Sequence, residues 1–148
     1  SAEVQALATG NAAGEPGRER QVIVTGSVPD LNTYVQGAAV AAAPLLYGAG
    51  IQNKVLEAMA CGTPVVATPQ ASVALTAVPG RDLLVAAEPA KFAAAMLELL
   101  ASPLRRDQVG RGGRAYVEAN HTWPGAAARL EEIYTSCAER KRTERIQH

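Results

Sequence analysis

The sequence predicts an α/β fold, a Rossmann-like parallel sheet with helices on both faces. Four short runs of small or β-branched residues alternate with segments of helical periodicity, which is the order that a parallel sheet requires. The longest run shows no alternation of polar and apolar residues, as expected of a strand covered on both faces. A chain of 148 residues fits one domain of ordinary size. We therefore expect a single domain over residues 1–148.

Residues 1–20 are predicted to precede a core that covers residues 21–148. Ala2–Ala8 favours a short helix, and Thr9–Arg20 combines three glycines and a proline with charged residues, which is typical of an exposed, flexible loop. Gln21–Thr25 is a β-branched run that a glycine stops, so it predicts the first strand.

The middle of the chain predicts a helix, a strand and a second helix. Asp30 is a good N-cap for a helix over Leu31–Gly37. Ala38–Leu46 predicts a buried strand, because Pro44 opposes a helix in this run. Ile51–Ala60 follows a glycine-containing loop and places its apolar residues on one helical face.

The last part of the chain completes the alternation. Thr63–Thr68 and Asp82–Ala86 predict two further strands, and Pro89–Leu100 is a strongly periodic helix. Leu104–Ala119 and Pro124–Arg142 predict two more helices.

Composition excludes several classes of protein. Lys plus Arg and Asp plus Glu are both 14, so there is no basic field to attract nucleic acid. Cys61 and Cys137 lie far apart and form no zinc or disulfide pattern, which favours a reducing cytoplasm. The longest apolar run, Ala38–Leu46, is far below the ~18 residues that span a bilayer.

The loop between the second predicted strand and its helix, Tyr47–Lys54, is the most informative segment. Ligands of open parallel sheets bind outside the carboxyl ends of the strands, where helix N-termini offer free amides to anions. Gly48 and Gly50 permit close backbone approach, and Lys54 can meet phosphate oxygens. The carboxylate of Glu57 can accept hydrogen bonds from both hydroxyls of a ribose. The pattern therefore suits a nucleoside diphosphate.

Spacing alone leaves two other interpretations open. Lys54 and Glu57 can be a surface ion pair beside glycines that only form a turn. The segment Gly48–Asn53 also nearly matches the dinucleotide fingerprint of NAD or FAD enzymes. Asn53 replaces the third glycine, however, and no acidic residue follows about 20 residues later, which disfavours a dehydrogenase.

Val24–Pro69 resembles the C-terminal domain of group 1 glycosyltransferases with the GT-B fold. Within that family it is most similar to the bacterial sugar transferases of exosortase-linked exopolysaccharide clusters. The specific part is GIQNKVLEAMACGTPVVAT, Gly50–Thr68, and the similarity continues through Gly80–Ala86 and His121–Tyr134. Most of the chain from about Gln21 on is covered.

The resemblance implies that this domain holds a nucleotide-diphosphate sugar donor while a separate N-terminal domain holds the acceptor. It implies transfer with retention of anomeric configuration, without a metal or another cofactor, and it identifies no catalytic residue. Glu57 matches the ribose-binding glutamate of the family, and the backbone at Val28 matches the place where the base is held. The residues whose amides would face the diphosphate or the sugar are Gly50, Ile51, Gln52, Asn53 and Lys54.

The chain departs from the family in two places. Many members carry a second glutamate that contacts the donor sugar, and Ala49 stands at that position, eight residues before Glu57. The opening strands of the family's domain, with an Arg and a Lys that clamp the diphosphate, are also missing, which implies an incomplete domain that is inactive alone. In a sheet of order 3-2-1-4-5-6 the strand Gln21–Thr25 would lose its neighbours, so we expect self-association or a rearranged sheet.

The function expected from these observations is glycosyl transfer in polysaccharide or glycoconjugate synthesis. The enzyme is expected in the cytoplasm. The mixed charge run Glu139–Arg145 favours a solvated helix end and leaves open a peripheral contact with the inner membrane in the intact enzyme. A non-catalytic nucleotide-binding or interaction module, which Ala49 permits, is an alternative. A GT-B sugar-nucleotide epimerase is another, although a chain with two histidines offers few groups for its acid–base chemistry.

Five further residues have structural expectations. We expect His121 to have a capping or packing role, Cys61 to be a small buried apolar residue and Trp123 to anchor the core. Asp82 and Glu88 bracket the last strand and are expected to be solvated turn residues without a functional role.

Overall fold

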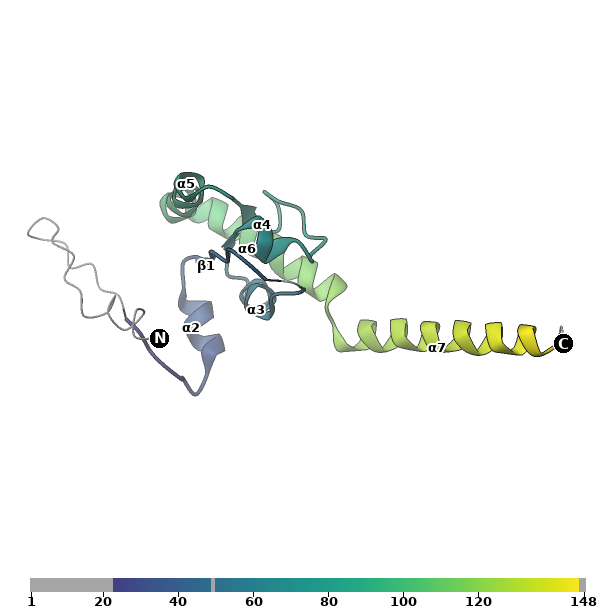
Figure 1. Cartoon of the computed structure of the whole chain (residues 1–148). Helices are drawn as coiled ribbons and strands as arrows, with labels where there is room; N and C mark the ends of the chain where they lie inside the picture. Colours follow the sequence, from purple (N-terminus) through teal and green to yellow (C-terminus); the bar gives the residue numbers. More distant parts are fainter. Residues whose placement is uncertain (1–22, 49, 147–148) are drawn as a thin grey trace, which may run out of the picture. The chain divides into compact units, whose positions relative to one another are not determined.

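The computed structural model of this chain describes residues 23–48 and 50–146, with side chains up to residue 140. The chain divides into two compact units, Ser1–Leu31 and Asn32–His148, each of which we describe by itself (Figure 1). The helix expected at Ala2–Ala8 and the loop expected at Thr9–Arg20 lie outside the described residues.

The described part of the first unit, residues 23–31, contains no strand. Ile23 is 69% exposed and Val24 is 41% exposed. An extended segment satisfies its backbone groups by pairing with a neighbouring strand, and the described residues of this unit supply none. The predicted strand Gln21–Thr25 is therefore wrong over its described residues.

The second unit is built on a parallel sheet in the order β1-β2-β3. Its strands are β1 (Ala41–Ala43), β2 (Val65–Ala67) and β3 (Leu84–Val85). The first two are shorter than the runs that predict them because Pro44 and Pro64, which have no backbone N–H, flank them. The paired residues are Ala41 with Val65, Ala42 with Val66, Ala43 with Ala67, Val66 with Leu84 and Ala67 with Val85.

The helices that the sequence predicts from Leu31 onward are confirmed, with small shifts at their ends. One helix was missed: α4 is four residues long, too short to show a helical period, and it begins at Pro69, whose fixed φ favours a first helical position. The helices are α2 (Leu31–Gly37), α3 (Asn53–Ala60), α4 (Pro69–Ser72), α5 (Pro89–Ala101), α6 (Pro103–Asn120) and α7 (Trp123–Ile146).

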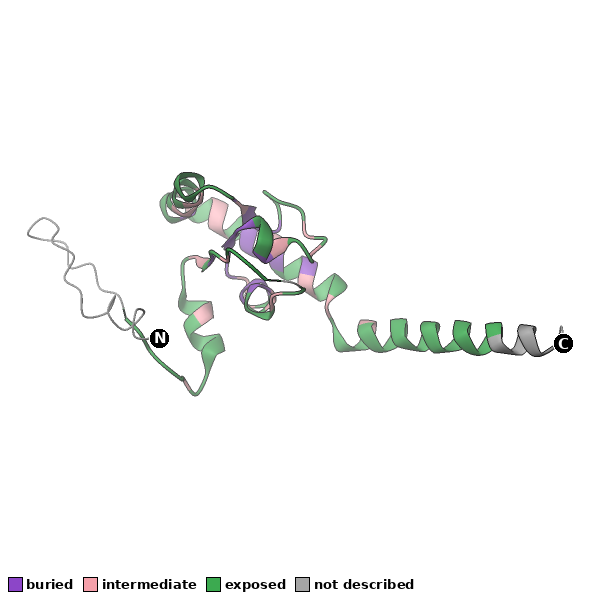
Figure 2. Ribbon diagram, viewed as in Figure 1, coloured by how far each residue is buried: buried purple, intermediate pink, exposed green. Residues whose placement is uncertain are grey.

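Buried apolar residues form a layer on each face of the sheet (Figure 2). On one face Val55 and Met59 of α3, both 0% exposed, pack with strand residues. On the other face Leu99 of α5 and Val109 of α6, also 0% exposed, pack against the sheet. The expected arrangement, a parallel sheet with helices on both faces, is confirmed.

Helix α6 contacts both layers because it crosses the amino ends of two strands. Three of its residues, Gly110, Gly112 and Gly113, lie against backbone carbonyls that precede β2 and β3. A Cβ atom at Gly110 would collide with the carbonyl oxygen of Gly62, and one at Gly112 with that of Arg81. Only glycine therefore allows this approach.

Beyond that crossing, α6 runs antiparallel to α3. Gly113 lies beside Met59 near the end of α3, and the end of α6 lines a pocket together with the start of α3. The end of α6 is thereby brought to the carboxyl edge of the sheet, where the predicted site lies.

Asp82 differs from its expectation, since it is buried and organises the turn before β3. Its side chain is 2% exposed, and its carboxylate accepts hydrogen bonds from the Val78 amide at 2.8 Å and from Arg81 Nε at 2.7 Å. The bonds from Arg81 hold the pKa of this carboxyl below its ordinary value of 3.8, against the opposing effect of burial. Glu88 is exposed and pairs with Lys91.

Two other expectations about single residues were wrong. Trp123 is 89% exposed, because no described residue of the unit covers it, so it does not anchor the core. Cys61 is half-buried rather than buried; it ends α3, and its thiol donates a long hydrogen bond to Asn32 Oδ1 at 4.0 Å. Both cysteines are free.

Candidate functional site

Buried Thr68 ties together the carboxyl ends of β1 and β2. Its Oγ1 donates a hydrogen bond to the carbonyl of Leu45 at 2.6 Å, and its amide donates to the carbonyl of Ala43 at 3.2 Å. The start of the loop that leads from β1 to α3 is therefore held at Leu45 by a hydrogen bond to β2's end.

This loop ends at the N-terminus of α3, which has no side-chain cap. Gly48 and Gly50 have φ values of 147° and 81°, which residues with a side chain rarely adopt. Gln52, the residue before α3, makes no side-chain capping bond, and the first turn of α3 contains no acidic residue. First-turn amides have no acceptor within their own helix, so those at Asn53 and Lys54 face outward as donors for an anion.

Glu57 lies one turn into α3, on the same face as Asn53. Its side chain is exposed, and among the described residues its carboxylate has neither a hydrogen bond nor an ion pair. Lys54 is likewise exposed and is not paired with Glu57. The surface ion pair between Lys54 and Glu57, one of the alternatives that their spacing allows, does not form. Both charged groups are therefore available to a ligand.

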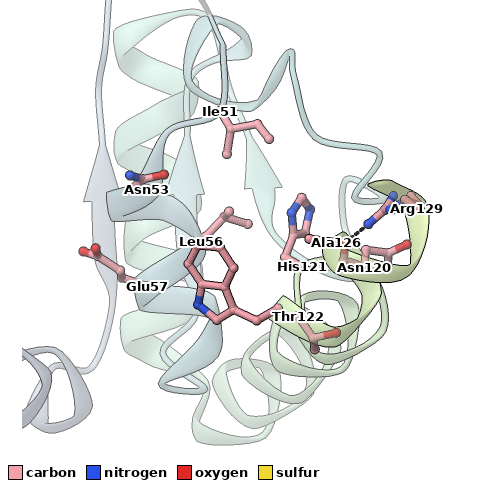
Figure 3. Close-up of a pocket in the computed structure, with 10 residues that line it drawn as sticks. Ile51, Asn53, Leu56, Glu57, Asn120, His121, Thr122, Ala126 and Arg129 are labelled. Atoms are coloured by element: carbon pink, nitrogen blue, oxygen red, sulfur yellow. Dashed lines mark hydrogen bonds between the residues drawn. The ribbon is translucent and has the colours of Figure 1, made fainter. Parts of the chain in front are cut away.

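A pocket of about 500 Å³ opens beside this part of α3 (Figure 3). One wall is formed by Asn53, Leu56 and Glu57 of α3, and the other by residues around the turn between α6 and α7. This volume is within the range of small-molecule sites. The lining residues are Ile51, Asn53, Leu56, Glu57, Asn120, His121, Thr122, Trp123, Ala126 and Arg129.

Hydrogen bonds at both ends of the α6–α7 turn fix the second wall. His121 ends α6, with its amide donating to the carbonyl of Val117 at 2.8 Å. Thr122 caps α7, because its Oγ1 accepts from the Gly125 amide at 3.3 Å. Arg129 Nη2 reaches back across the turn to the carbonyl of Asn120 at 2.8 Å.

The imidazole of His121 connects this wall to the core. Its Nε2 lies 2.9 Å from the hydroxyl of buried Tyr116, and the two rings are 5.2 Å apart. The same hydroxyl accepts a hydrogen bond from the Thr76 amide at 3.0 Å. The expected capping and packing role of His121 is therefore confirmed, and His121 also lines the pocket.

The structure brings most of the predicted donor-site residues together. Ile51, Asn53 and Glu57 line the pocket, and Gly50, Gln52 and Lys54 adjoin them in the same loop and helix turn. Val28 is half-buried and belongs to the other unit, so its contact with the base stays a prediction. Ala49, where the family's second glutamate is missing, lies outside the described residues.

The sequence analysis missed the second wall of the pocket. Trp123 was expected to anchor the core and Arg129 was only part of a helical pattern, and nothing in local spacing indicates that α6 returns them to α3. The weak signal was the glycine cluster of α6, since repeated glycines inside a helix indicate close backbone approach.

The described residues contain neither a cluster of metal ligands nor a membrane-spanning helix. Histidine, cysteine and carboxylate side chains nowhere gather in groups of three that could hold a metal ion within this part of the chain. None of its helices has the length and hydropathy that crossing a membrane requires. The expectation of a metal-free reaction stays a prediction.

Comparison with known proteins identifies a family. Residues 2–102 match the family described as "Glycosyl transferases group 1". A GDP-mannose-dependent monoacylated alpha-(1-6)-phosphatidylinositol monomannoside mannosyltransferase of Corynebacterium glutamicum is 39% identical over 82 residues, which cover 55% of this chain and 22% of that protein.

Two further similar proteins are consistent with this family. A D-inositol 3-phosphate glycosyltransferase of Corynebacterium diphtheriae is 33% identical over 111 residues, covering 74% of this chain and 26% of that protein. A sucrose-phosphate synthase from Thermosynechococcus elongatus has a similar structure, with a TM-score of 0.64 and 29% identity over 72% of this chain and 27% of that one. The chain thus spans about a quarter of the length of the relatives it matches.

Proposed function

Because this chain belongs to the group 1 glycosyltransferases, we propose that its unit Asn32–His148 binds the nucleotide-diphosphate sugar donor of a glycosyl transfer reaction. The observation that carries the proposal is the environment of Glu57. An exposed carboxylate without a partner lies one turn after an uncapped helix N-terminus, beside a pocket of about 500 Å³. These are the groups that a ribose and a diphosphate require.

Each part of the donor has a matching group in the chain. The ribose hydroxyls donate to Glu57, while the diphosphate accepts from the outward amides at Asn53 and Lys54 and from the Lys54 ammonium. Gly50 lets the backbone approach the ligand closely, because its φ of 81° excludes most side chains. Ile51 and Gln52 complete the loop, and the Val28 backbone contacts the base.

The reaction that we propose is transfer of the glycosyl group with retention of configuration, needing no metal. The acceptor is held by a second domain, as the greater length of the relatives supports. Guanine is the first base to test, since one relative is named as GDP-mannose-dependent. The resemblance of Gly50–Thr68 to exopolysaccharide transferases supports a polysaccharide or glycoconjugate product.

We propose the cytoplasm as the place of this reaction. The two cysteines remain free thiols, which suits a reducing compartment. A peripheral contact with the inner membrane would bring the enzyme to lipid-linked acceptors, and self-association remains a further proposal for this chain.

Calorimetric titration with GDP, UDP and ADP tests donor binding. We expect one diphosphate to bind, and Glu57→Gln to weaken it by about 10- to 100-fold, because hydrogen bonds to a charged group are lost. Glu132→Gln is the matched control, since Glu132 is an exposed carboxylate of α7 away from the pocket. The proposal fails if none of the three binds the folded chain, or if Glu57→Gln binds as tightly as the parent.

A further inference from the structure

We propose that Trp123 is a specific part of the donor site, a wall on which the nucleobase stacks. The inference rests on the proposed function, because it concerns the base of the nucleotide whose ribose Glu57 holds. Trp123 and Glu57, from different elements, line one pocket. No feature of the sequence alone connects them.

The exposure of Trp123 is the first observation. Tryptophan is largely buried in most proteins, since its ring removes a large apolar area from water. Here the side chain is 89% exposed at the edge of a pocket. An exposed aromatic ring beside a concave site offers a flat π-surface to a ligand, and every base has a π-face that can stack on it.

The second observation is that the turn carrying Trp123 is held in place. Thr122 caps the helix that begins at Trp123, and Gly125 leaves room for this cap, because a Cβ there would lie 3.1 Å from Thr122 Oγ1. The hydrogen bond from Arg129 to the carbonyl of Asn120 also spans the turn. A turn whose backbone is held before the ligand arrives loses little backbone conformational entropy on binding.

The third observation is the order of groups along the donor. In any nucleoside diphosphate the ribose is bonded to the phosphate on one side and to the base on the other. The amides at Asn53 and Lys54 lie at the start of α3, and Glu57 follows about 6 Å further along the helix. With the diphosphate at the first position and the ribose at the second, the base enters the pocket that Glu57 and Trp123 share.

Stacking on the face of the base is separate from recognition of its edge. The edge carries the hydrogen-bonding groups that distinguish guanine, uracil and adenine, whereas the face is shared by all three. We therefore assign to Trp123 a contribution to affinity that is similar for the three bases. Choice among them belongs to the groups that contact the edge.

The fluorescence of the chain reports directly on this contact, because Trp123 is its single tryptophan. The ligand is the diphosphate that binds in the calorimetric titration, and the base-free probes are ribose 5-phosphate and inorganic pyrophosphate. We expect the diphosphate to quench the indole emission with the same Kd as calorimetry gives. The base-free probes should leave the emission unchanged after correction for absorbed light.

Variants at the same position provide the second measurement. Trp123→Ala should weaken diphosphate binding by about 5- to 100-fold, and Trp123→Phe should restore most of the affinity, since a smaller ring still stacks. Tyr134→Ala is the matched control, because Tyr134 is an aromatic residue of the same helix that is 68% exposed and does not line the pocket. An 89% exposed side chain can be removed without unfolding the chain, which a melting curve checks.

Three outcomes would overturn the inference. In the first outcome, a diphosphate binds and its binding requires Glu57, but the Trp123→Ala variant binds it as tightly as the parent and the emission of the parent is not quenched. The inference about Trp123 then fails, while the proposed donor site stands. If base-free probes quench the emission as strongly, the contact is not with the base. If no diphosphate binds at all, the proposed function fails as well.

Discussion

Asp82 and Glu57 bear the same charge in opposite surroundings. Asp82 is 2% exposed at the amino end of β3 and accepts hydrogen bonds from Arg81 and the Val78 amide. Glu57 is exposed at the carboxyl edge and has no partner among the described residues. Asp82, which is buried and hydrogen-bonded, therefore serves the fold, and Glu57 is available to a ligand.

Replacing Asp82 should destabilise the chain in a pH-dependent way. The folded pKa of Asp82 is lowered, so its stabilisation is present above the ordinary value of 3.8 and is lost as the pH falls through the folded pKa. We expect Asp82→Asn to reduce the free energy of unfolding by about 1–2 kcal/mol near pH 7, since Arg81 is largely solvent-exposed and its share is screened. Urea unfolding of both chains from pH 7 to pH 3 measures the difference, which should shrink with acidification.

Glu88→Gln is the control for this measurement. Glu88 pairs with Lys91 on the surface, with both side chains more than half exposed, so its loss should leave the free energy of unfolding nearly unchanged. An Asp82→Asn effect as small as that of Glu88→Gln, or one that grows toward low pH, would contradict our account of the buried carboxylate.

At the scale of the element, α6 determines how the two layers and the pocket are assembled. Its glycines allow it to cross the amino ends of β2 and β3, and it then runs along α3 to the pocket. The cost is a low intrinsic helix propensity, because each glycine in a helix is about 1 kcal/mol less favourable than alanine. Close packing offsets this cost.

Gly110→Ala should therefore destabilise the chain, although alanine is the better helix former. The added Cβ collides with the carbonyl oxygen of Gly62, which is backbone and can move only with the turn before β2. We expect the free energy of unfolding to fall by about 1–3 kcal/mol, measured by urea denaturation. Gly37→Ala is the matched control: nothing lies near a Cβ there, so it should be neutral or slightly stabilising.

At the scale of the whole molecule, the folded core ends near His121. Tyr116 is the last buried residue of α6, whereas every described side chain of α7 from Ala126 to Arg140 is exposed. A helix without a buried face adds little to the stability of the unit, because most helical stability in proteins comes from tertiary packing.

Truncation tests this boundary. A chain ending after Glu132 keeps every residue of the pocket, and we expect its melting temperature to change by no more than about 2 °C. A chain ending after Ala115 lacks Tyr116 and its hydrogen bond to Thr76, so it should lose cooperative melting. Circular dichroism during heating distinguishes the two, and a large loss of stability in the longer chain would show that α7 packs on the core.

The sequence predicted the parallel sheet and its helices because those features leave local signals. A β-branched run marked β2, a short apolar run marked β3, and a helical period marked α3 and α5 to within about two residues. Burial depends instead on which elements meet. Trp123 was placed in the core because it is large and apolar, although no described element covers it.

The same reasoning explains which half of the candidate site was found. Asn53, Lys54 and Glu57 were predicted because they lie close together at the start of a helix that a glycine-containing loop joins to a strand, in a segment that resembles the family. His121 and Arg129 reach the pocket only through the path of α6, which depends on contacts between the glycines and two distant turns. Contacts between segments that lie far apart in the chain produce no periodic pattern of residues in the sequence.

Strand β2 has a consequence for the dynamics of the unit. All three of its residues are buried; Val65 and Ala67 belong to one apolar layer, and Val66 to the other. Because β2 packs in both apolar layers, full opening of either layer exposes β2 to water and removes its packing from the other layer. The two layers therefore unfold cooperatively. The β2 amides should consequently exchange with solvent deuterium only through global opening, while the α7 amides exchange by local fraying.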